Sequence, residues 1–146
     1  MFFSQTAIYA LRALSFLGKY RERGPMRAKD LSEHTGVPIH YLSKIMRRMV
    51  EAGLVFSQKG HGGGFIIARP LEEISLQDII SAVDGSHELQ TCVFGWDECN
   101  EENPCPLHPF WCQFKQIQHQ WLEGNTLADI VENRRANIKL EIDTTC

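Results

Sequence analysis

The chain has 146 residues, of which 43% are hydrophobic and 23% charged, a composition typical of one globular domain with or without a short extension. No run of about 18 apolar residues occurs, which excludes a membrane-spanning helix. The apolar start has no basic segment ahead of it, so we expect no secretion signal and a cytoplasmic protein. Thiols stay reduced in that compartment, where clustered cysteines more often bind metal or sense redox state than form structural disulfides.

The net charge of −3 hides an asymmetry between the two halves of the chain. Residues 1–70 hold 11 of the 15 Lys and Arg but only 4 of the 18 Asp and Glu, and residues 71–146 hold the other 14 acidic residues. This division favours a basic half that meets a polyanion and an acidic half with another role. Solvated surfaces can also be unevenly charged, so the interpretation depends on the architecture of the basic half.

Apolar and small residues recur at helical spacing over residues 4–20, which predicts a first amphipathic helix. A short helix over 28–35 follows, and Gly36 is placed to end it in the left-handed conformation. Pro38 opens the next helix, because proline is tolerated in a first helical turn. Two short helices joined by a tight turn predict a helix-turn-helix, although similar pairs also occur as simple hairpins in helical domains.

The second helix of this pair has two chemically different faces. Leu42, Ile45 and Met46 recur at the spacing of a buried face, and Met49 continues it, whereas the other face is polar and basic. In a helix-turn-helix the second helix enters the major groove of DNA, and its first residues touch base edges. The residues of the polar face that are predicted to bind DNA are His40, Tyr41, Ser43, Lys44 and Arg47.

Two short β-rich runs, 54–57 and 65–68, follow this helix and predict a β-hairpin. The glycine-rich sequence KGHGGG between them permits close backbone approach and unusual dihedral angles. The predicted fold class is therefore mainly α with a small β-hairpin, a winged helix-turn-helix over residues 1–85. Lys59 and His61 at the tip of the hairpin suit a narrow, phosphate-lined groove. A glycine loop can also cradle a nucleotide phosphate, but the spacing GxxxxGK[ST] of such loops is absent.

A further helix is predicted over 75–84, with Ser75 as its cap and Gly85 at its end. Residues 86–108 then form a loop rich in cysteine and acidic residues. Its potential ligands are widely spaced, which favours a cluster of several atoms, since structural zinc sites more often use two tight ligand pairs. Zinc and unligated thiols stay open as alternatives. The ligand candidates, separated by six, five and two residues, are Cys92, Cys99, Cys105 and His108.

Residues 109–123 predict a long helix whose aromatic side chains form a heptad-like seam. Pro109 starts this helix, which makes His108 its cap. The helix is too aromatic to face water, so we expect it to pair with its twin in a homodimer. Such a dimer would present two reading heads to a pseudo-palindromic DNA operator. The seam is formed by Phe110, Phe114, Ile117 and Trp121, and is widened by Trp111 and Leu122.

A short helix capped by Asn125 or Thr126 completes the predicted dimerisation region, which spans 109–133. The tail over 134–146 shows no clear pattern, and we expect it to be mobile. Cys146, at the end of this tail, is therefore not an expected ligand.

These features occur in an order that resembles the IscR/NsrR family of dimeric winged-helix regulators over residues 1–133. The resemblance rests on KGHGGGF in the wing, on ISLQDIISAVDG, on a three-cysteine loop that ends in CPLH, and on TLADIVEN. It implies a bacterial transcription factor that senses iron–sulfur status, nitric oxide or redox stress through a cluster near the dimer interface. The three cysteines of the loop match the family's cysteine ligands, and His108 matches the histidine of the IscR-like branch, which carries [2Fe–2S].

Several positions depart from the family pattern. Other branches take the fourth ligand from an acidic residue in the first helix of the partner subunit. At the matching place this chain has Ile8, and no Asp or Glu occurs from residue 1 to 21. Lys59 stands where an arginine is usual, and Ser43 where the IscR-like branch has glutamate, so the resemblance does not define the operator sequence. Cys112, one helical turn after His108, is an additional thiol, and it leaves [4Fe–4S] open beside [2Fe–2S].

The sequence therefore predicts a DNA-binding transcription regulator, for example a repressor. No enzyme is expected, because no acid–base or nucleophile constellation occurs outside the cysteine loop. One alternative is a regulator of the same fold that uses its thiols or a zinc ion directly. Another is an electron-transfer protein, which would not need a basic winged helix.

Overall fold

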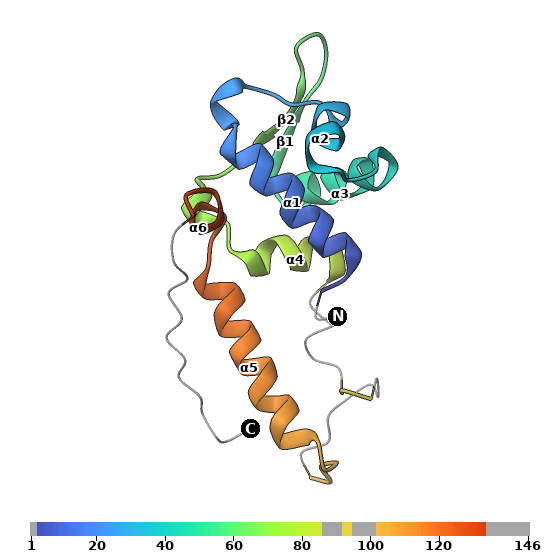
Figure 1. The fold of residues 1–146 in the computed structure, drawn as a ribbon, viewed down its shortest axis with the longest axis vertical. Coiled ribbons are helices and arrows are strands. Elements are labelled where there is room, and N and C mark those ends of the chain that lie inside the picture. Colours follow the sequence, from blue (N-terminus) through green and yellow to red (C-terminus); the bar gives the residue numbers. More distant parts are fainter. Residues whose placement is uncertain (1–2, 86–91, 95–101, 134–146) are drawn as a thin grey trace.

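The structure, a computed structural model, describes residues 3–85, 92–94 and 102–133. The helices in these ranges are α1 (Gln5–Lys19), α2 (Ala28–Thr35), α3 (Ile39–Glu51), α4 (Leu76–Asp84), α5 (His108–Gly124) and α6 (Leu127–Val131). Strands β1 (Val55–Gln58) and β2 (Gly64–Ile67) form an antiparallel hairpin, and short 3-10 helices lie at Arg21–Arg23 and Leu71–Glu73. Figure 1 shows α1, α2, α3 and the hairpin at one end of the fold, with α5 running away from them. The predicted fold class, a mainly α winged helix-turn-helix followed by a long C-terminal helix, is confirmed.

Local sequence signals set the ends of the first helices. Ser4 caps α1, and its hydroxyl oxygen accepts the Ala7 N–H at 2.9 Å. Gly36 ends α2 with a φ of 71°, in the left-handed region that glycine adopts at little cost. Pro38 is the N-cap of α3 and lies just before its first turn, because its ψ of 135° is extended rather than helical. The expected helices are thus confirmed, and the position of Pro38 is corrected by one residue.

A single hydrophobic core connects the winged helix to the C-terminal helices. α3 contributes the face expected from its sequence, and α1 and α4 pack against this helix. Leu122 of α5 and Leu127 of α6 are fully buried in the same core. The prediction that Leu122 widens the pairing seam is therefore wrong, because its side chain packs inside its own chain. The α3 side chains with at most 1% exposed area are Leu42, Ile45, Met46 and Met49.

The hairpin is fixed to the segment that precedes α2. β1 begins one residue later, and β2 one residue earlier, than the predicted runs. Gln58 pairs with Gly64 next to the turn of the hairpin. The Met26 N–H donates to the Phe65 carbonyl at 3.1 Å, and the Phe65 N–H donates back to the Met26 carbonyl at 2.7 Å. Gly64 permits this close approach, because a Cβ atom there would lie 2.5 Å from the Met26 backbone.

α4 and α6 begin side by side and are capped in the same way. Ser75 and Thr126 form an isolated antiparallel bridge, which two backbone hydrogen bonds of 2.9 and 2.8 Å flank. Asp78 and Asp129 complete capping boxes with these two residues. Thr126 is therefore the cap of α6, whereas Asn125 lies buried just before it.

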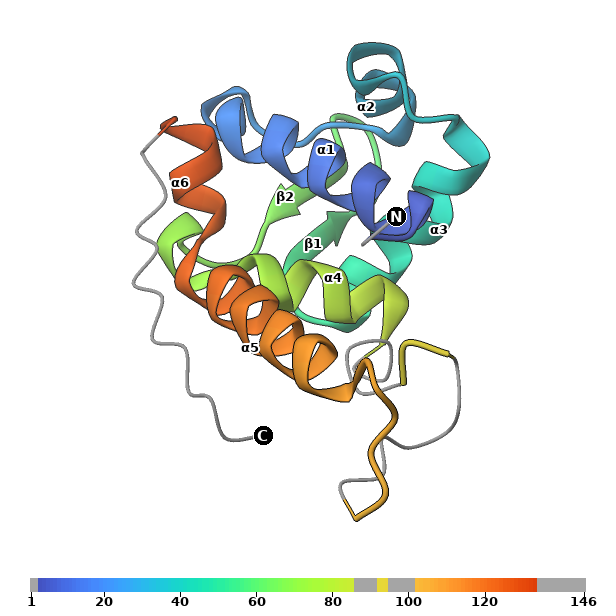
Figure 2. The same ribbon diagram turned by 60° about the horizontal axis from the view of Figure 1, so that its bottom comes forward.

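α5 lies along α4, and α6 packs on α1, so the C-terminal helices are docked on the winged helix (Figure 2). Within the part of the chain that the structure describes, no helix is long and apolar enough to cross a membrane. The predictions for Cys99, for the tail over 134–146 and for Cys146 fall outside the described residues.

Candidate DNA-reading surface and cysteine loop

All five predicted DNA-binding residues of α3 lie on its exposed side. The opposite side of the helix is buried in the core, so helical periodicity separates a packing face from an accessible one. Figure 1 shows α3 at the edge of the fold, next to α2. The exposed residues are His40, Tyr41, Ser43, Lys44 and Arg47.

Ring contacts brace the beginning of α3. The centroids of the His40 and Tyr41 rings lie 4.4 Å apart, and the Tyr41 ring lies 5.8 Å from that of Tyr9 in α1. Ser43, one turn later, donates its hydroxyl to the Ile39 carbonyl at 3.0 Å. The hydroxyl hydrogen of Ser43 is thus used inside the helix, and its oxygen lone pairs remain for a base edge.

The three cations of α3 have different environments. Lys44 is exposed and has no ion-pair partner among the described residues. Arg47 Nε lies 3.2 Å from Glu51 Oε1, and the two side chains are 83% and 63% exposed. Exposed pairs of this kind are weak, so a phosphate can compete for Arg47. Arg48 is on the outer face in the sequence pattern, but its Nη1 donates to the Val83 carbonyl and thereby ties α3 to the end of α4.

The tip of the hairpin carries Lys59 and His61, and both side chains are exposed. Gly62 has a φ of 73°, and a Cβ atom on Gly63 would lie 2.2 Å from the Gln58 carbonyl oxygen. The tight tip therefore requires glycine at these positions. Figure 1 shows the loop between β1 and β2 projecting beyond the helices, where a nucleic acid can reach it.

Three of the four ligand candidates lie in the described residues. Cys92 is buried and Cys105 half-buried, and both have free thiols. The His108 N–H donates to the Cys105 carbonyl at 3.0 Å, which holds these two residues on one turn at the start of α5. His108 is only 9% exposed, so its imidazole lies largely buried beside that turn.

The start of α5 differs by one residue from the prediction. Leu107 is the N-cap and His108 the first helical residue, so His108 does not cap the helix. The first helical hydrogen bond runs from the Trp111 N–H to the Leu107 carbonyl at 3.0 Å. Pro109 then occupies the second position, where the helix needs no N–H donor.

Cys112 is disulfide-bonded in the structure. Neither Cys92 nor Cys105 is its partner, because both of these thiols are free. The Cys112 sulfur is therefore not available as a metal ligand in this state.

The described residues alone do not assemble a metal site. No group of three or more His, Cys, Asp or Glu side chains within them comes together around a possible metal position. Their donor chemistry nevertheless fits an iron–sulfur cluster, because two thiols are free and a buried imidazole shares one turn with the thiol of Cys105. Cys99 would have to supply the third sulfur.

Two features of this surface were not predicted from the sequence. Ile39, the first residue of α3, is 49% exposed, and Tyr9 supports the reading helix from α1. Ile39 is recoverable from the sequence, because it follows Pro38 directly and lies off the centre of the buried face. The contact of Tyr9 with Tyr41 joins two helices that are distant in the chain, and no local signal reports it.

An exposed polar helix, a glycine-tipped wing and a basic N-terminal half define a DNA-binding protein of the winged-helix class. The chain belongs to the Rrf2 family, described as an iron-dependent transcriptional regulator, whose sequence pattern matches residues 3–133. This assignment confirms a DNA-binding transcription regulator rather than an enzyme.

Individual relatives agree with the family. The chain is 31% identical over 126 residues to the HTH-type transcriptional regulator IscR of Serratia proteamaculans (strain 568), covering 86% of this chain and 76% of that protein. The solved structure of T. potens IscR is 26% identical, with a TM-score of 0.74 over 94% of this chain and 91% of that one. CymR (YrzC), the global cysteine regulator of B. subtilis, has a TM-score of 0.77 over 89% of this chain and 95% of its own, at 24% identity, and shows the fold alone.

Proposed function

We propose that this protein is a bacterial transcription regulator that binds operator DNA as a homodimer and senses its signal through an iron–sulfur cluster. It would act in the cytoplasm, where bacterial DNA lies. The observation that carries the sensing role is His108, which is buried at the start of α5 and lies one turn from the free thiol of Cys105. The family's description as iron-dependent favours iron over zinc.

The proposed DNA contacts divide by their place on the winged helix. His40, Tyr41 and Ser43 come first along α3, where base edges of the major groove are reached. Lys44 and Arg47 lie further along the exposed face, where they would contact phosphates. Lys59 and His61 would enter the neighbouring groove from the wing, and their phosphate contacts would fix the register of the protein on DNA.

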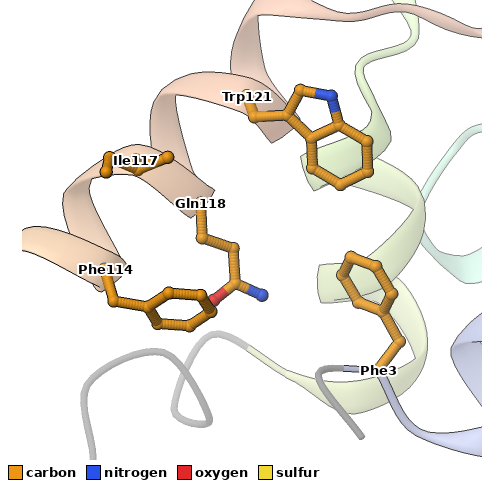
Figure 3. Close-up of a pocket in the computed structure, with 5 residues that line it drawn as sticks. All are labelled: Phe3, Phe114, Ile117, Gln118 and Trp121. Atoms are coloured by element: carbon orange, nitrogen blue, oxygen red, sulfur yellow. The ribbon is translucent and has the colours of Figure 1, made fainter. Parts of the chain in front are cut away.

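The proposed pairing surface lies on α5. Phe110 is 75% exposed, and Trp111 and Phe114 stack with ring centroids 5.6 Å apart. An apolar pocket of about 330 Å³ opens on this helix (Figure 3). Exposed apolar surface of this kind marks an interaction site, and the same helix of a second copy would cover it under two-fold symmetry. The residues that line the pocket are Phe3, Phe114, Ile117, Gln118 and Trp121.

The proposed cluster ligands are Cys92, Cys99, Cys105 and His108. They would hold [2Fe–2S], and [4Fe–4S] or zinc are the alternatives for the same residues. When bound, an iron–sulfur cluster supplies one-electron redox chemistry and reactivity towards oxidants and nitric oxide. His108 is the first residue of α5, so one turn of the chain sets both the position of its imidazole and the start of the pairing helix. A sensor at this junction can therefore affect how two reading heads are placed.

A thiol switch is the second candidate function, and the disulfide of Cys112 favours it. In this version the regulator responds directly to the oxidation of its cysteines, without iron. The two versions predict different compositions of the purified protein, so one preparation can separate them.

Protein purified under argon should be brown and contain about two iron and two acid-labile sulfide per chain, as expected for [2Fe–2S]. The measurement combines metal analysis, sulfide analysis and the visible spectrum. Colourless protein with one zinc per chain would favour zinc. Metal-free protein whose DNA affinity changes on thiol oxidation would favour the thiol switch.

A further inference from the structure

Ile39 places an apolar side chain where recognition helices touch base edges. It is the first residue of α3 and is 49% exposed. Single exposed apolar side chains are common and mean little by themselves. This one is distinguished by its position, because the first residues of such a helix reach into the major groove. Tyr41, in the same turn, is 47% exposed, so the tip of the helix has a substantial apolar component.

A hydrogen bond within α3 occupies the donor of the polar side chain nearest to Ile39 along this face of the helix. Ser43 lies one turn after Ile39 on the same side of the helix, and its hydroxyl donates to the Ile39 carbonyl at 3.0 Å. The Ser43 hydroxyl hydrogen is therefore directed to the backbone and cannot also be given to a base. This flank of the helix tip offers DNA the hydrocarbon groups of Ile39 and an acceptor oxygen.

The tip is also held in place, which a small contact requires. The ring of Tyr41 is supported on one side by His40 at 4.4 Å and on the other by Tyr9 of α1 at 5.8 Å. Isoleucine has few χ1 rotamers because it is branched at Cβ. Little side-chain entropy is therefore lost when DNA binds, and a contact as small as one methyl group can affect affinity.

The C5-methyl group of thymine is the apolar group that base pairs present in the major groove. We propose that Ile39 reads a thymine methyl group in each half-site and so sets a thymine preference that the polar residues of α3 do not supply. The inference rests on the proposed role of α3 as the reading helix.

Replacement of single thymines by deoxyuridine tests the inference. Selection of a random duplex pool on the full-length protein supplies the operator, and each thymine is then replaced in both half-sites. Deoxyuridine lacks the methyl group but keeps every hydrogen-bonding group. The wild-type dissociation constant should rise about fourfold per half-site at one position, the effect of burying one methyl group. For Ile39→Ala the same replacement should change the dissociation constant by less than about 1.5-fold, as in a double-mutant cycle.

Two further variants control for the loss of an apolar side chain. Ile39→Val keeps the branched carbon and should keep the response to deoxyuridine. Ile130→Ala removes an isoleucine of α6 that is 42% exposed, and its deoxyuridine profile should match the wild type.

Two results would overturn the inference while leaving the proposed function intact. One is salt-dependent operator binding that is insensitive to deoxyuridine at every thymine. The other is Ile39→Ala protein with the full wild-type response. Failure of the wild-type protein to select any DNA would overturn the proposed function, and this inference with it.

Discussion

α3 and α5 are both amphipathic helices that bury one side in the same core, but their exposed faces differ in chemistry. The accessible face of α3 is polar and carries Lys44 and Arg47. The accessible face of α5 is aromatic, with Phe110 exposed and Phe114 and Trp121 lining an open apolar pocket. The buried pattern of each helix determines its place in the fold. The residues on the other face suit different proposed partners, DNA for α3 and a second protein surface for α5.

The end of α4 connects these two faces. Arg48 of α3 donates to the Val83 carbonyl, and the Ser4 hydroxyl, at the start of α1, donates to Asp84 Oδ1 at 2.5 Å. In the sequence, the cysteine loop begins directly after Gly85, the C-cap of α4, and ends at His108, the first residue of α5. A ligand bound by that loop would therefore act between an element tied to the reading helix and the start of the pairing helix.

The largest effect is expected when a proposed cluster ligand in this loop is replaced. Cys105→Ser should reduce iron and acid-labile sulfide to near zero, because the cluster needs each of its thiolates. Cys112→Ser is the matched control and should keep both contents, since Cys112 is not one of the proposed ligands. Metal and sulfide analysis under argon checks this. Full iron in Cys105→Ser protein would contradict the ligand assignment, as would loss of iron in the control alone.

The second largest effect is expected for a charged substitution on the exposed apolar face of α5. Ile117→Asp places a charge in the apolar pocket of α5 and should convert the dimer to monomer. Operator affinity should then fall at least about 100-fold, because binding to one half-site no longer supports binding to the other. Ile130→Asp adds the same charge on α6 and should leave both properties unchanged. Analytical ultracentrifugation and fluorescence anisotropy measure them, and a dimeric Ile117→Asp protein would show that α5 is not the interface.

A smaller effect on DNA binding is expected for a substitution on the exposed face of α3. Lys44→Ala should weaken operator binding about tenfold near 0.1 M salt and reduce the slope of log K against log salt by about 1, the value for one lost phosphate contact. Lys19→Ala removes an exposed lysine of α1 and should keep the wild-type slope. Titrations at four salt concentrations give the slopes. Equal slopes for all three proteins would remove Lys44 from the interface.

The smallest effect is expected on thermal stability, for a substitution in α2, which packs against α3. A hydrogen bond from the Arg27 side chain holds the pKa of Asp30 below its ordinary value of 3.8. A lowered carboxyl pKa stabilises the fold above pH 3.8, and this stabilisation is lost as the pH falls through the folded-state pKa. Asp30→Asn should therefore lower Tm by about 2 °C at pH 7, and the difference should vanish in strong acid. A Tm difference that persists in acid would assign the effect to packing instead of charge.

The winged helix was predictable because its signals are local. Gly36 after α2, the capping box of Ser75 and the apolar spacing of α3 each fix an element within a few residues. The position of Leu122 was not predictable in this way, since burial against α4 and burial in a dimer leave the same sequence pattern.

The candidate site was predictable in its residue types but not in its arrangement. Cysteine and histidine at these spacings indicate a metal or cluster. The contacts of Arg48 with Val83 and of Tyr9 with Tyr41 join elements that are distant in the sequence. Such contacts depend on the packing of the whole core, which no short pattern encodes.

The link between the cysteine loop and DNA binding is measured by the affinity of the protein for its selected operator, under argon, before and after a chelator removes the cluster. The dissociation constant should change at least about tenfold, within the range typical of coupled sites. Cys105→Ser protein should show no change on the same treatment. An operator affinity that is identical with and without the cluster would show that the cysteine loop has no effect on the helices that bind DNA, and that the cluster is not the sensor.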